Sequence, residues 1–98
     1  MAEIKWTAEA EKWLHDIYDY IAQDNSDAAL GVVSGIYQKA QLLCDHPEVG
    51  YIYRKEPEGE IRILLYGHYR IAYLVRSKDR VDILGVFHGA LDIDRYLS

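Results

Sequence analysis

Three apolar runs in the second half of the chain carry its clearest pattern. They are rich in isoleucine, valine, leucine and tyrosine, and short polar or glycine-containing breaks separate them: Ile61–Tyr66, Tyr69–Arg76 and Val81–His88. Runs of this kind predict three consecutive antiparallel strands. Alternation in the middle run predicts one face with Tyr69, Ile71, Tyr73 and Val75 and an opposite face with Arg70, Ala72, Leu74 and Arg76.

The first half of the chain has the apolar spacing of two helices. Thr7 is the expected N-cap of the first helix, whose apolar stripe comprises Ala10, Trp13, Leu14, Ile17 and Ile21. Asp24-Asn25-Ser26 breaks this pattern, and Ser26 or Asp27 is the expected cap of the second helix. The second stripe comprises Ala29, Val33, Ile36, Ala40 and Leu43, and the helix is expected to stop before Pro47.

Two glycines interrupt the second helix. Gly31 and Gly35 each cost about 1 kcal/mol relative to alanine inside a helix. We interpret them as permitting a close approach of the first helix, and a simple loss of helix propensity is the alternative. Trp6 and Trp13 are expected in the core where the helices meet the sheet.

These elements predict an α+β fold in a single domain covering residues 1–98. An N-terminal strand at Ile4-Lys5-Trp6 precedes an antiparallel helix hairpin, which packs on one face of a mainly antiparallel sheet in the order β-α-α-β-β-β. Residues 48–60 are expected to form a surface loop, and a short tail or helical turn follows His88. The other face of the sheet is expected to stay uncovered, with arginines free to act there.

Charge is unevenly distributed along the chain. The formal net charge is −5, with three lysines against nine acidic residues in positions 1–50 and eight basic against seven acidic residues afterwards. This balance argues against broad nucleic-acid binding and puts any polyanion contact on the strands. The single cysteine, Cys44, allows no internal disulfide. Cys44-Asp45-His46 has no complementary pair of ligands, so we expect neither a metal nor a cofactor.

The sequence offers no segment for export or membrane insertion. The start lacks an apolar run of signal-peptide length, and no window reaches the length of a membrane span. We therefore expect a cytoplasmic protein with no membrane partner.

The face on which the arginines lie depends on the turn between the first two predicted C-terminal strands. A three-residue Tyr66-Gly67-His68 loop puts Arg62 and Arg70 on the same face, whereas a two-residue Gly67-His68 turn puts them on opposite faces. We favour the three-residue loop, with both arginines on the face away from the helices. A structural pairing of Arg70 with Asp82 also stays open. His88 is either a hydrogen-bonded strand-end cap or a general acid.

Several motifs then point to a known family when taken in order. They are Ile4-Lys5-Trp6-Thr7 with Ala10 and Leu14, Tyr18-Asp19-Tyr20-Ile21-Ala22 with Asp24-Asn25 and Ala28-Ala29, Leu43 with Pro47 and Gly50, Tyr69-Arg70-Ile71-Ala72-Tyr73, and Val81 to Gly89 with Asp92. Together they resemble the RelE/ParE superfamily of toxins from type II toxin–antitoxin systems, also called plasmid stabilisation proteins. The helix hairpin and closing strand are more similar to the ParE-type branch.

This resemblance implies a growth-inhibiting toxin neutralised by a cognate antitoxin, and a homodimer or a toxin–antitoxin hetero-oligomer as the assembly. ParE-like members imply DNA gyrase as the target, and this is the function we favour. RelE-like members imply metal-independent cleavage of mRNA on the ribosome, for which the catalytic candidates are Arg62, Arg70 and His88. Leu64 stands where a second cation would be expected, which weakens that alternative. A third alternative is a degenerate member that keeps the fold and antitoxin binding but not toxicity. The candidate target-binding residues are Arg54, Arg62, Tyr69, Arg70, His88 and Tyr96.

Overall fold

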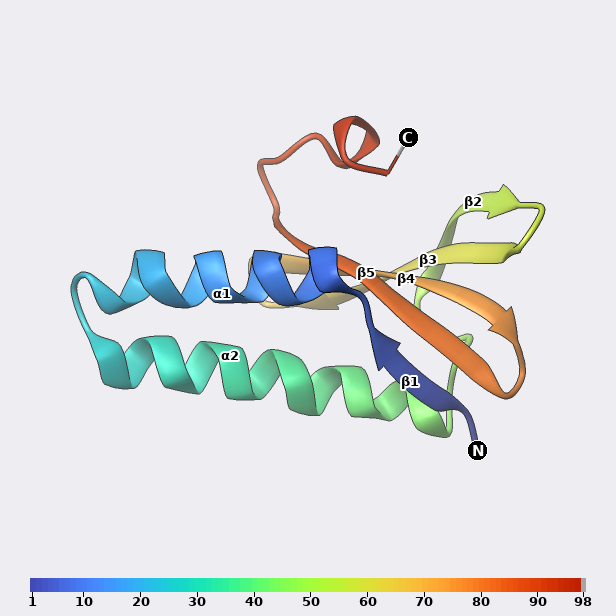
Figure 1. Cartoon of the computed structure of the whole chain (residues 1–98), viewed down its shortest axis with the longest axis horizontal. Coiled ribbons are helices and arrows are strands. Elements are labelled where there is room, and N and C mark those ends of the chain that lie inside the picture. The colour runs from blue at the N-terminus through green and yellow to red at the C-terminus, as the bar shows by residue number, and fades with distance from the viewer. Residues whose placement is uncertain (98) are drawn as a thin grey trace.

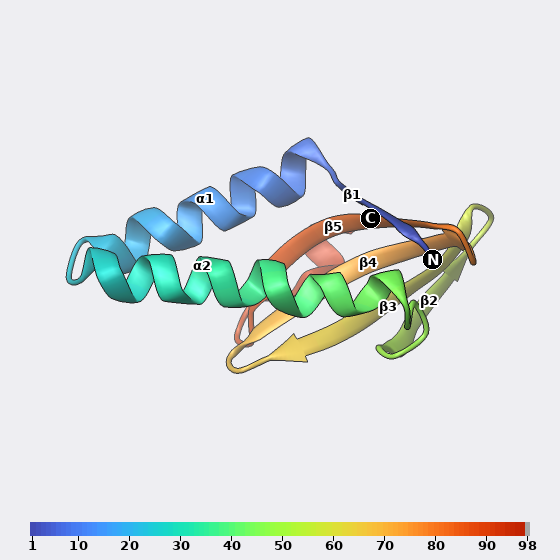
Figure 2. The same cartoon turned by 90° about the horizontal axis from the view of Figure 1, so that it is seen from below.

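A helix hairpin packs against a twisted sheet, as Figures 1 and 2 show. The computed structural model describes residues 1–97. The helices and strands, in chain order, are β1 (Glu3–Trp6), α1 (Ala8–Ala22), α2 (Ser26–Gln41), β2 (Tyr51–Glu56), β3 (Gly59–Tyr66), β4 (Tyr69–Ser77) and β5 (Arg80–His88). Short 3-10 turns follow α2 and β5, at Leu42–Cys44 and Ile93–Arg95. The predicted α+β class, the helix hairpin and the three C-terminal strands are confirmed.

The sheet has one more strand than predicted. Its order is β1-β5-β4-β3-β2, with β1 parallel to β5 and every other neighbouring pair antiparallel. The prediction of a surface loop over residues 48–60 is wrong, because β2 lies within that range. Tyr51, Ile52 and Tyr53 favour a strand, and Pro57 falls in the turn that follows, where it removes no ladder hydrogen bond.

The helix ends follow capping chemistry. Thr7 caps α1 as predicted, because its Oγ1 accepts a hydrogen bond from the Ala10 N–H at 3.1 Å. The cap of α2 is Asn25 rather than Ser26 or Asp27, and its Oδ1 accepts from the Ala28 N–H at 3.0 Å. The Asn25 backbone is extended, as a cap residue requires.

The glycine in the middle of α2 makes room for the sheet and not for α1. A Cβ at Gly35 would lie 1.9 Å from the hydroxyl oxygen of Tyr66 in β3. At Gly31 a Cβ would meet nothing within 4 Å. The expectation that both glycines permit approach of the first helix is therefore wrong.

The main core lies between the helices and one face of the sheet, which we call the helix face. The predicted alternation in β4 is confirmed, since Tyr69, Ile71, Tyr73 and Val75 all pack into this core. From the helices, Leu14 and Ile36 are buried against them. Trp6 packs at the margin, with its ring centroid 4.6 Å from that of Tyr37.

The opposite face, which we call the far face, carries a second and smaller core. It consists of Ile63, Ala72, Phe87 and Ile93. Ile93 belongs to the C-terminal segment, residues 89–97, which crosses the sheet on the side away from α2 (Figure 1). The Tyr53 hydroxyl also donates a hydrogen bond to the Asp94 carboxylate and so ties β2 to this segment. The expectation of an uncovered far face is wrong for this part of the sheet.

None of the helices within residues 1–97 is both long and apolar enough to cross a membrane.

Candidate functional site

The turn between β3 and β4 decides where the candidate arginines lie. Tyr66 and Tyr69 are direct cross-strand partners, so Gly67-His68 is a two-residue turn and the three-residue loop we favoured is wrong. Gly67, at the first central position, has a φ of 57°, as a type II′ turn requires. In this register Arg62 faces Tyr73 on the helix face, whereas Arg70 faces Leu65 and Phe87 on the far face. The two arginines therefore do not share a face.

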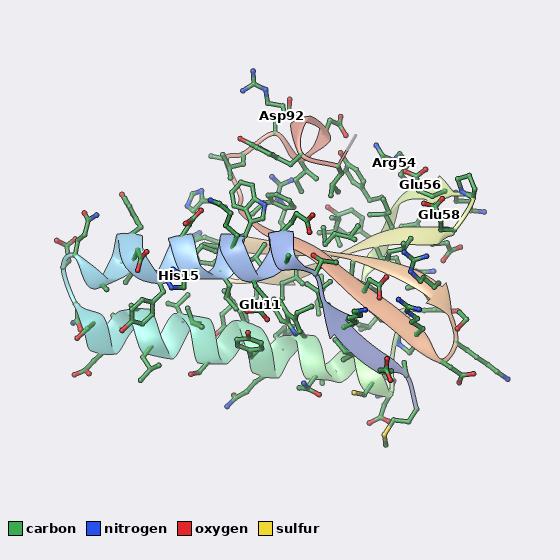
Figure 3. All side chains as sticks on the ribbon, in the orientation of Figure 1. Glu11, His15, Arg54, Glu56, Glu58 and Asp92 are labelled. Atoms are coloured by element: carbon green, nitrogen blue, oxygen red, sulfur yellow. The ribbon has the colours of Figure 1, made fainter. Side chains whose placement is uncertain are left out.

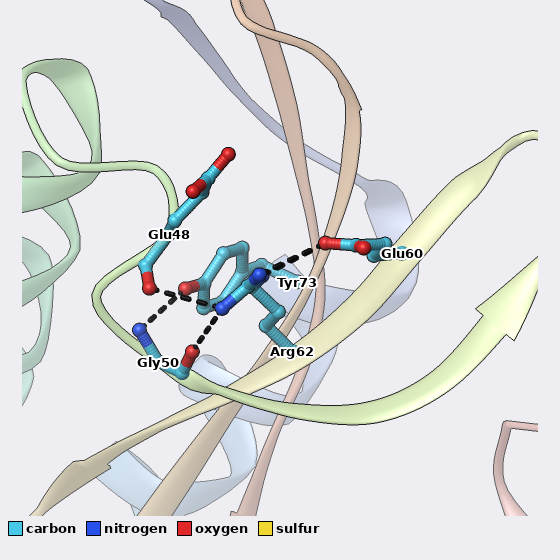
Figure 4. A network of polar contacts seen from close by, with 5 residues as sticks. All are labelled: Glu48, Gly50, Glu60, Arg62 and Tyr73. Carbon is cyan, nitrogen blue, oxygen red and sulfur yellow. Dashed lines mark hydrogen bonds and ion pairs between the residues drawn. The ribbon is translucent and has the colours of Figure 1, made fainter.

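Arg62 belongs to a polar network that fastens the α2–β2 connection to the sheet (Figure 4). Its Nη1 donates to the backbone oxygens of Gly50 and Glu48 at 2.7 and 2.9 Å, and its Nη2 lies 3.0 Å from the Glu60 carboxylate. Nearby, the Gly50 N–H donates to the Tyr73 hydroxyl at 2.8 Å, and burial raises the pKa of that phenol. The Arg62 side chain is only 12% exposed. Its geometry is that of a structural clamp.

Arg70 anchors the C-terminal segment from the far face. Its Nη2 donates to the backbone oxygens of Leu91 at 2.5 Å and Gly89 at 3.2 Å. Its Nε is buried and has no hydrogen-bond partner within residues 1–97. The alternative pairing of Arg70 with Asp82 is wrong, because Asp82 binds Arg76 at 2.5 Å instead.

His88 lies at the end of β5 and faces Tyr69 across the strands. Its Nδ1 accepts a hydrogen bond from the Ala90 N–H at 3.3 Å, which is the strand-end cap considered above. Its ring meets Tyr69 edge-on at 5.8 Å between centroids, and the His68 ring stacks at 6.5 Å.

The last two candidates, Arg54 and Tyr96, hold the C-terminal segment over the far face. Arg54 and Glu56 project from β2 and form an ion pair of 2.8 Å (Figure 3), and Arg54 also donates to the Leu97 backbone oxygen. Tyr96 stacks on Phe87 at 5.7 Å and meets the Trp13 ring edge-on at 5.0 Å. Neither residue lies with His88.

An apolar groove of about 400 Å³ opens between α1 and the end of the sheet, and we call it the sheet-end groove. Its lining residues are Trp13, Asp16, Ile17 and Tyr20 of α1, Tyr69, Val86 and His88 of the strands, and Ala90 and Leu91. The α1 residues recur at helical spacing and so share one side of the helix. Sequence reasoning treated Trp13 as core and Ile17 as part of the apolar stripe, and it missed Asp16 and Tyr20. No signal in the sequence identifies these two residues, because both lie outside the apolar stripe and only the packing of α1 against the end of the sheet brings them into the groove.

A second hollow of about 400 Å³ adjoins this groove at the β3–β4 turn. Tyr69, His88 and Ala90 line both, and His68 and Arg70 line the second. Three of the predicted target-binding residues, Tyr69, Arg70 and His88, thus meet at one end of the sheet. Burial, together with the nearby Tyr20, raises the pKa of the Tyr69 phenol.

The three catalytic candidates, Arg62, Arg70 and His88, do not all lie together. Cleavage of RNA through its 2′-hydroxyl needs a base, an acid and cations for the phosphorane-like transition state. Arg62 pairs with Tyr73 of β4 on the helix face. His88 pairs with Tyr69, which lies four positions before Tyr73 in β4. Within residues 1–97 no three histidine, cysteine, aspartate or glutamate side chains gather as a metal site.

Comparison with known proteins agrees with this fold. The sequence model of the family described as "ParE toxin of type II toxin-antitoxin system, parDE" matches residues 4–93. The chain belongs to the ParE toxin family. A comparison with curated proteins gives no match.

Two solved structures share the fold of this ParE-family chain. One is titled as the chromosomal ParDE toxin–antitoxin system from P. aeruginosa, with a TM-score of 0.72 and 24% identity over 90% of this chain and 96% of the other. The second is titled as the RelBE2 toxin–antitoxin complex from Mycobacterium tuberculosis, with a TM-score of 0.65 and 23% identity over 89% and 96% of the two chains. These two structures show the shared fold, and the family-model match over residues 4–93 confirms the RelE/ParE resemblance drawn from the sequence.

Proposed function

We propose that this ParE-family chain inhibits DNA gyrase by binding and that the sheet-end groove is its contact surface. One observation carries the proposal: the arginines that a nuclease would need at one site lie on opposite faces of the sheet. Both guanidinium groups are moreover held by backbone carbonyl oxygens. A toxin that acts by binding needs an accessible apolar and aromatic surface, and the groove supplies one.

An antitoxin is the second partner of this proposal. Family membership supports a cognate antitoxin, and an antitoxin segment that covers Trp13, Ile17 and Tyr20 would block the groove. Such a segment would be disordered alone and would fold on binding, as many regulatory tails do. The proposed site of action for both partners is the cytoplasm.

Supercoiling of relaxed plasmid by purified gyrase tests the proposal. We expect supercoiling to be lost as the protein is titrated to a molar excess and to be restored when the cognate antitoxin is added. Full supercoiling at excess toxin would contradict gyrase as the target.

A ribosome-dependent endoribonuclease is the alternative, and one observation favours it. His68 and His88 line the hollow that Arg70 also lines, so two imidazoles lie near one guanidinium. Toeprinting on translating ribosomes distinguishes the two functions. Cuts in the ribosomal A site that are lost in both His68→Ala and His88→Ala would favour the alternative, and we expect none.

A further inference from the structure

The opposite end of β4 from the sheet-end groove carries a buried carboxylate between two arginines. Asp82 of β5 is the one charged residue among residues 1–97 whose exposure falls to 4%, and it lies on the far face opposite Leu74. The Arg76 Nε lies 2.5 Å from one carboxylate oxygen, and the Arg80 Nε lies 3.4 Å from the other. The two side chains themselves remain 38% and 48% exposed.

A β-bulge brings Arg76 into this position. Val75 pairs with Val81 and Ser77 pairs with Arg80, so Arg76 is an extra residue without a partner in the register. Bulges re-aim a side chain that regular pleating would send elsewhere. Arg80, just after the turn, reaches the same carboxylate from two positions earlier in β5.

Arg76 and Arg80 each bind the Asp82 carboxylate through the Nε of the arginine alone. Within residues 1–97 the terminal Nη groups of Arg76 and Arg80 make no hydrogen bond to another side chain or backbone group. The cluster retains one net positive charge, and Lys5 of β1 is the register partner of Asp82 on the same side of the sheet. Each planar guanidinium group is thus held by Asp82 at its Nε, while its Nη groups stay available to donate hydrogen bonds to a ligand. This arrangement loses little conformational entropy when an oxyanion binds.

We propose that Arg76 and Arg80 form a receptor for a carboxylate side chain of a protein partner, with Asp82 as the positioning residue beneath them. Arginine binds carboxylates through paired, charge-assisted hydrogen bonds, for which the free Nη groups are suited. This surface is separate from the sheet-end groove, and the proposal does not depend on gyrase as the target.

The surroundings favour a protein carboxylate over the phosphates of a nucleic acid. Glu3 is the register partner of Arg80, and the charge of Glu58, in the β2–β3 turn (Figure 3), acts on Arg76. Asp79 precedes Arg80, and the chain as a whole carries a net charge of −5. Closely spaced phosphates would meet these acids, whereas a single carboxylate on a partner of mixed charge need not.

Side-chain NMR of the full-length protein tests this receptor. The arginine Nε–Hε signals are followed while a short glutamate-containing peptide is added at constant ionic strength, and a DNA oligonucleotide of equal formal charge is the second probe. We expect the peptide to shift the Arg76 and Arg80 signals saturably and the oligonucleotide to bind more weakly. Absence of saturable shifts would overturn the proposal. Tighter binding of the oligonucleotide would also overturn it, because the ligand would then be a phosphate and not a carboxylate.

Two variants separate a receptor from general charge attraction. Arg80→Gln removes one guanidinium group. We expect it to weaken peptide binding roughly tenfold, which is the effect of losing a charge-assisted hydrogen bond. Arg76→Lys keeps the charge but loses the planar fork, and we expect it to weaken binding too. Lys78→Gln removes an equal charge from the adjacent turn and should leave binding nearly unchanged. Equal losses in Lys78→Gln and Arg80→Gln would overturn the proposal.

Discussion

Tyr73 and Gly50, 23 residues apart, are joined by a hydrogen bond of 2.8 Å from the Gly50 N–H to the phenolic oxygen. This bond lies within the Arg62 network and fixes the point at which the chain leaves the helices and enters the sheet. A Cβ at Gly50 would lie 2.5 Å from the Ile63 backbone oxygen and 2.7 Å from the Tyr73 hydroxyl, so glycine is required by space.

Tyr73→Phe should therefore destabilise the fold. The substitution leaves the buried Gly50 N–H without its acceptor, which costs about 1–3 kcal/mol. Urea denaturation followed by circular dichroism measures this loss. Tyr51→Phe is the matched control, because the Tyr51 side chain is exposed on β2. Equal stability of the two variants would show that the Gly50–Tyr73 hydrogen bond contributes no stability.

The two glycines of α2 should respond differently to alanine. Gly31→Ala adds a methyl group into open space and should raise the free energy of unfolding by up to about 1 kcal/mol through helix propensity. Gly35→Ala would collide with the Tyr66 ring, so the propensity gain should be cancelled or reversed. Thermal unfolding of both variants checks this contrast. Equal stabilisation would mean that Tyr66 moves aside at no cost.

Asp82 should make the stability of the fold depend on acid pH. Burial opposes its ionisation, but the hydrogen bonds and charges of Arg76 and Arg80 outweigh burial and lower the pKa of this carboxyl. A lowered pKa contributes stability above the unfolded value of about 4, and that stability is lost as the pH falls further. The stability difference between the wild-type protein and Asp82→Asn should shrink from pH 5 downwards. A difference that stays constant to pH 2 would contradict the lowered pKa.

The two arginine clamps should act on different parts of the backbone. Arg70→Met removes the donor to the Gly89 and Leu91 oxygens and should speed amide hydrogen exchange in residues 89–97. Arg62→Met should instead speed exchange at residues 48–50. Each variant is the control for the other, and exchange mapped by NMR or mass spectrometry separates them. The same exchange pattern in both variants would mean global destabilisation rather than local release.

Strong local patterns were sufficient to predict most of the fold. The helical stripes and the alternation of β4 each express one period and one buried face, and the Thr7 cap follows from the chemistry of a single side chain. All three agree with the structure. β2 was missed because Glu48, Gly50, Pro57 and Gly59 suggest a loop, while its strand-forming residues are few. Its pairing with β3 is a tertiary effect that short-range propensity does not contain.

The candidate site was harder to predict because it depends on register. A change of one residue in the Gly67-His68 turn moves the side chains of β3 to the other face relative to those of β4, so Arg62 was misplaced while Arg70 was not, and the sequence allows either turn. The groove also depends on how α1 sits against the end of β5, which brings Tyr20 near Tyr69 and His88. No spacing within α1 alone shows which side of that helix faces the sheet end.

Gyrase inhibition by a groove variant is the most direct test of the claim that the sheet-end groove is the acting surface. Tyr20→Glu puts a charge into the groove at a residue that is 76% exposed, so the fold should be kept. Leu30→Glu, at a residue 58% exposed on α2 and outside the groove, is the matched control. In the supercoiling assay we predict equal inhibition by the wild-type protein and Leu30→Glu. Tyr20→Glu should need at least a tenfold higher concentration for the same inhibition, which corresponds to a loss of about 1.4 kcal/mol in binding free energy. Equal inhibition by all three proteins would contradict the account.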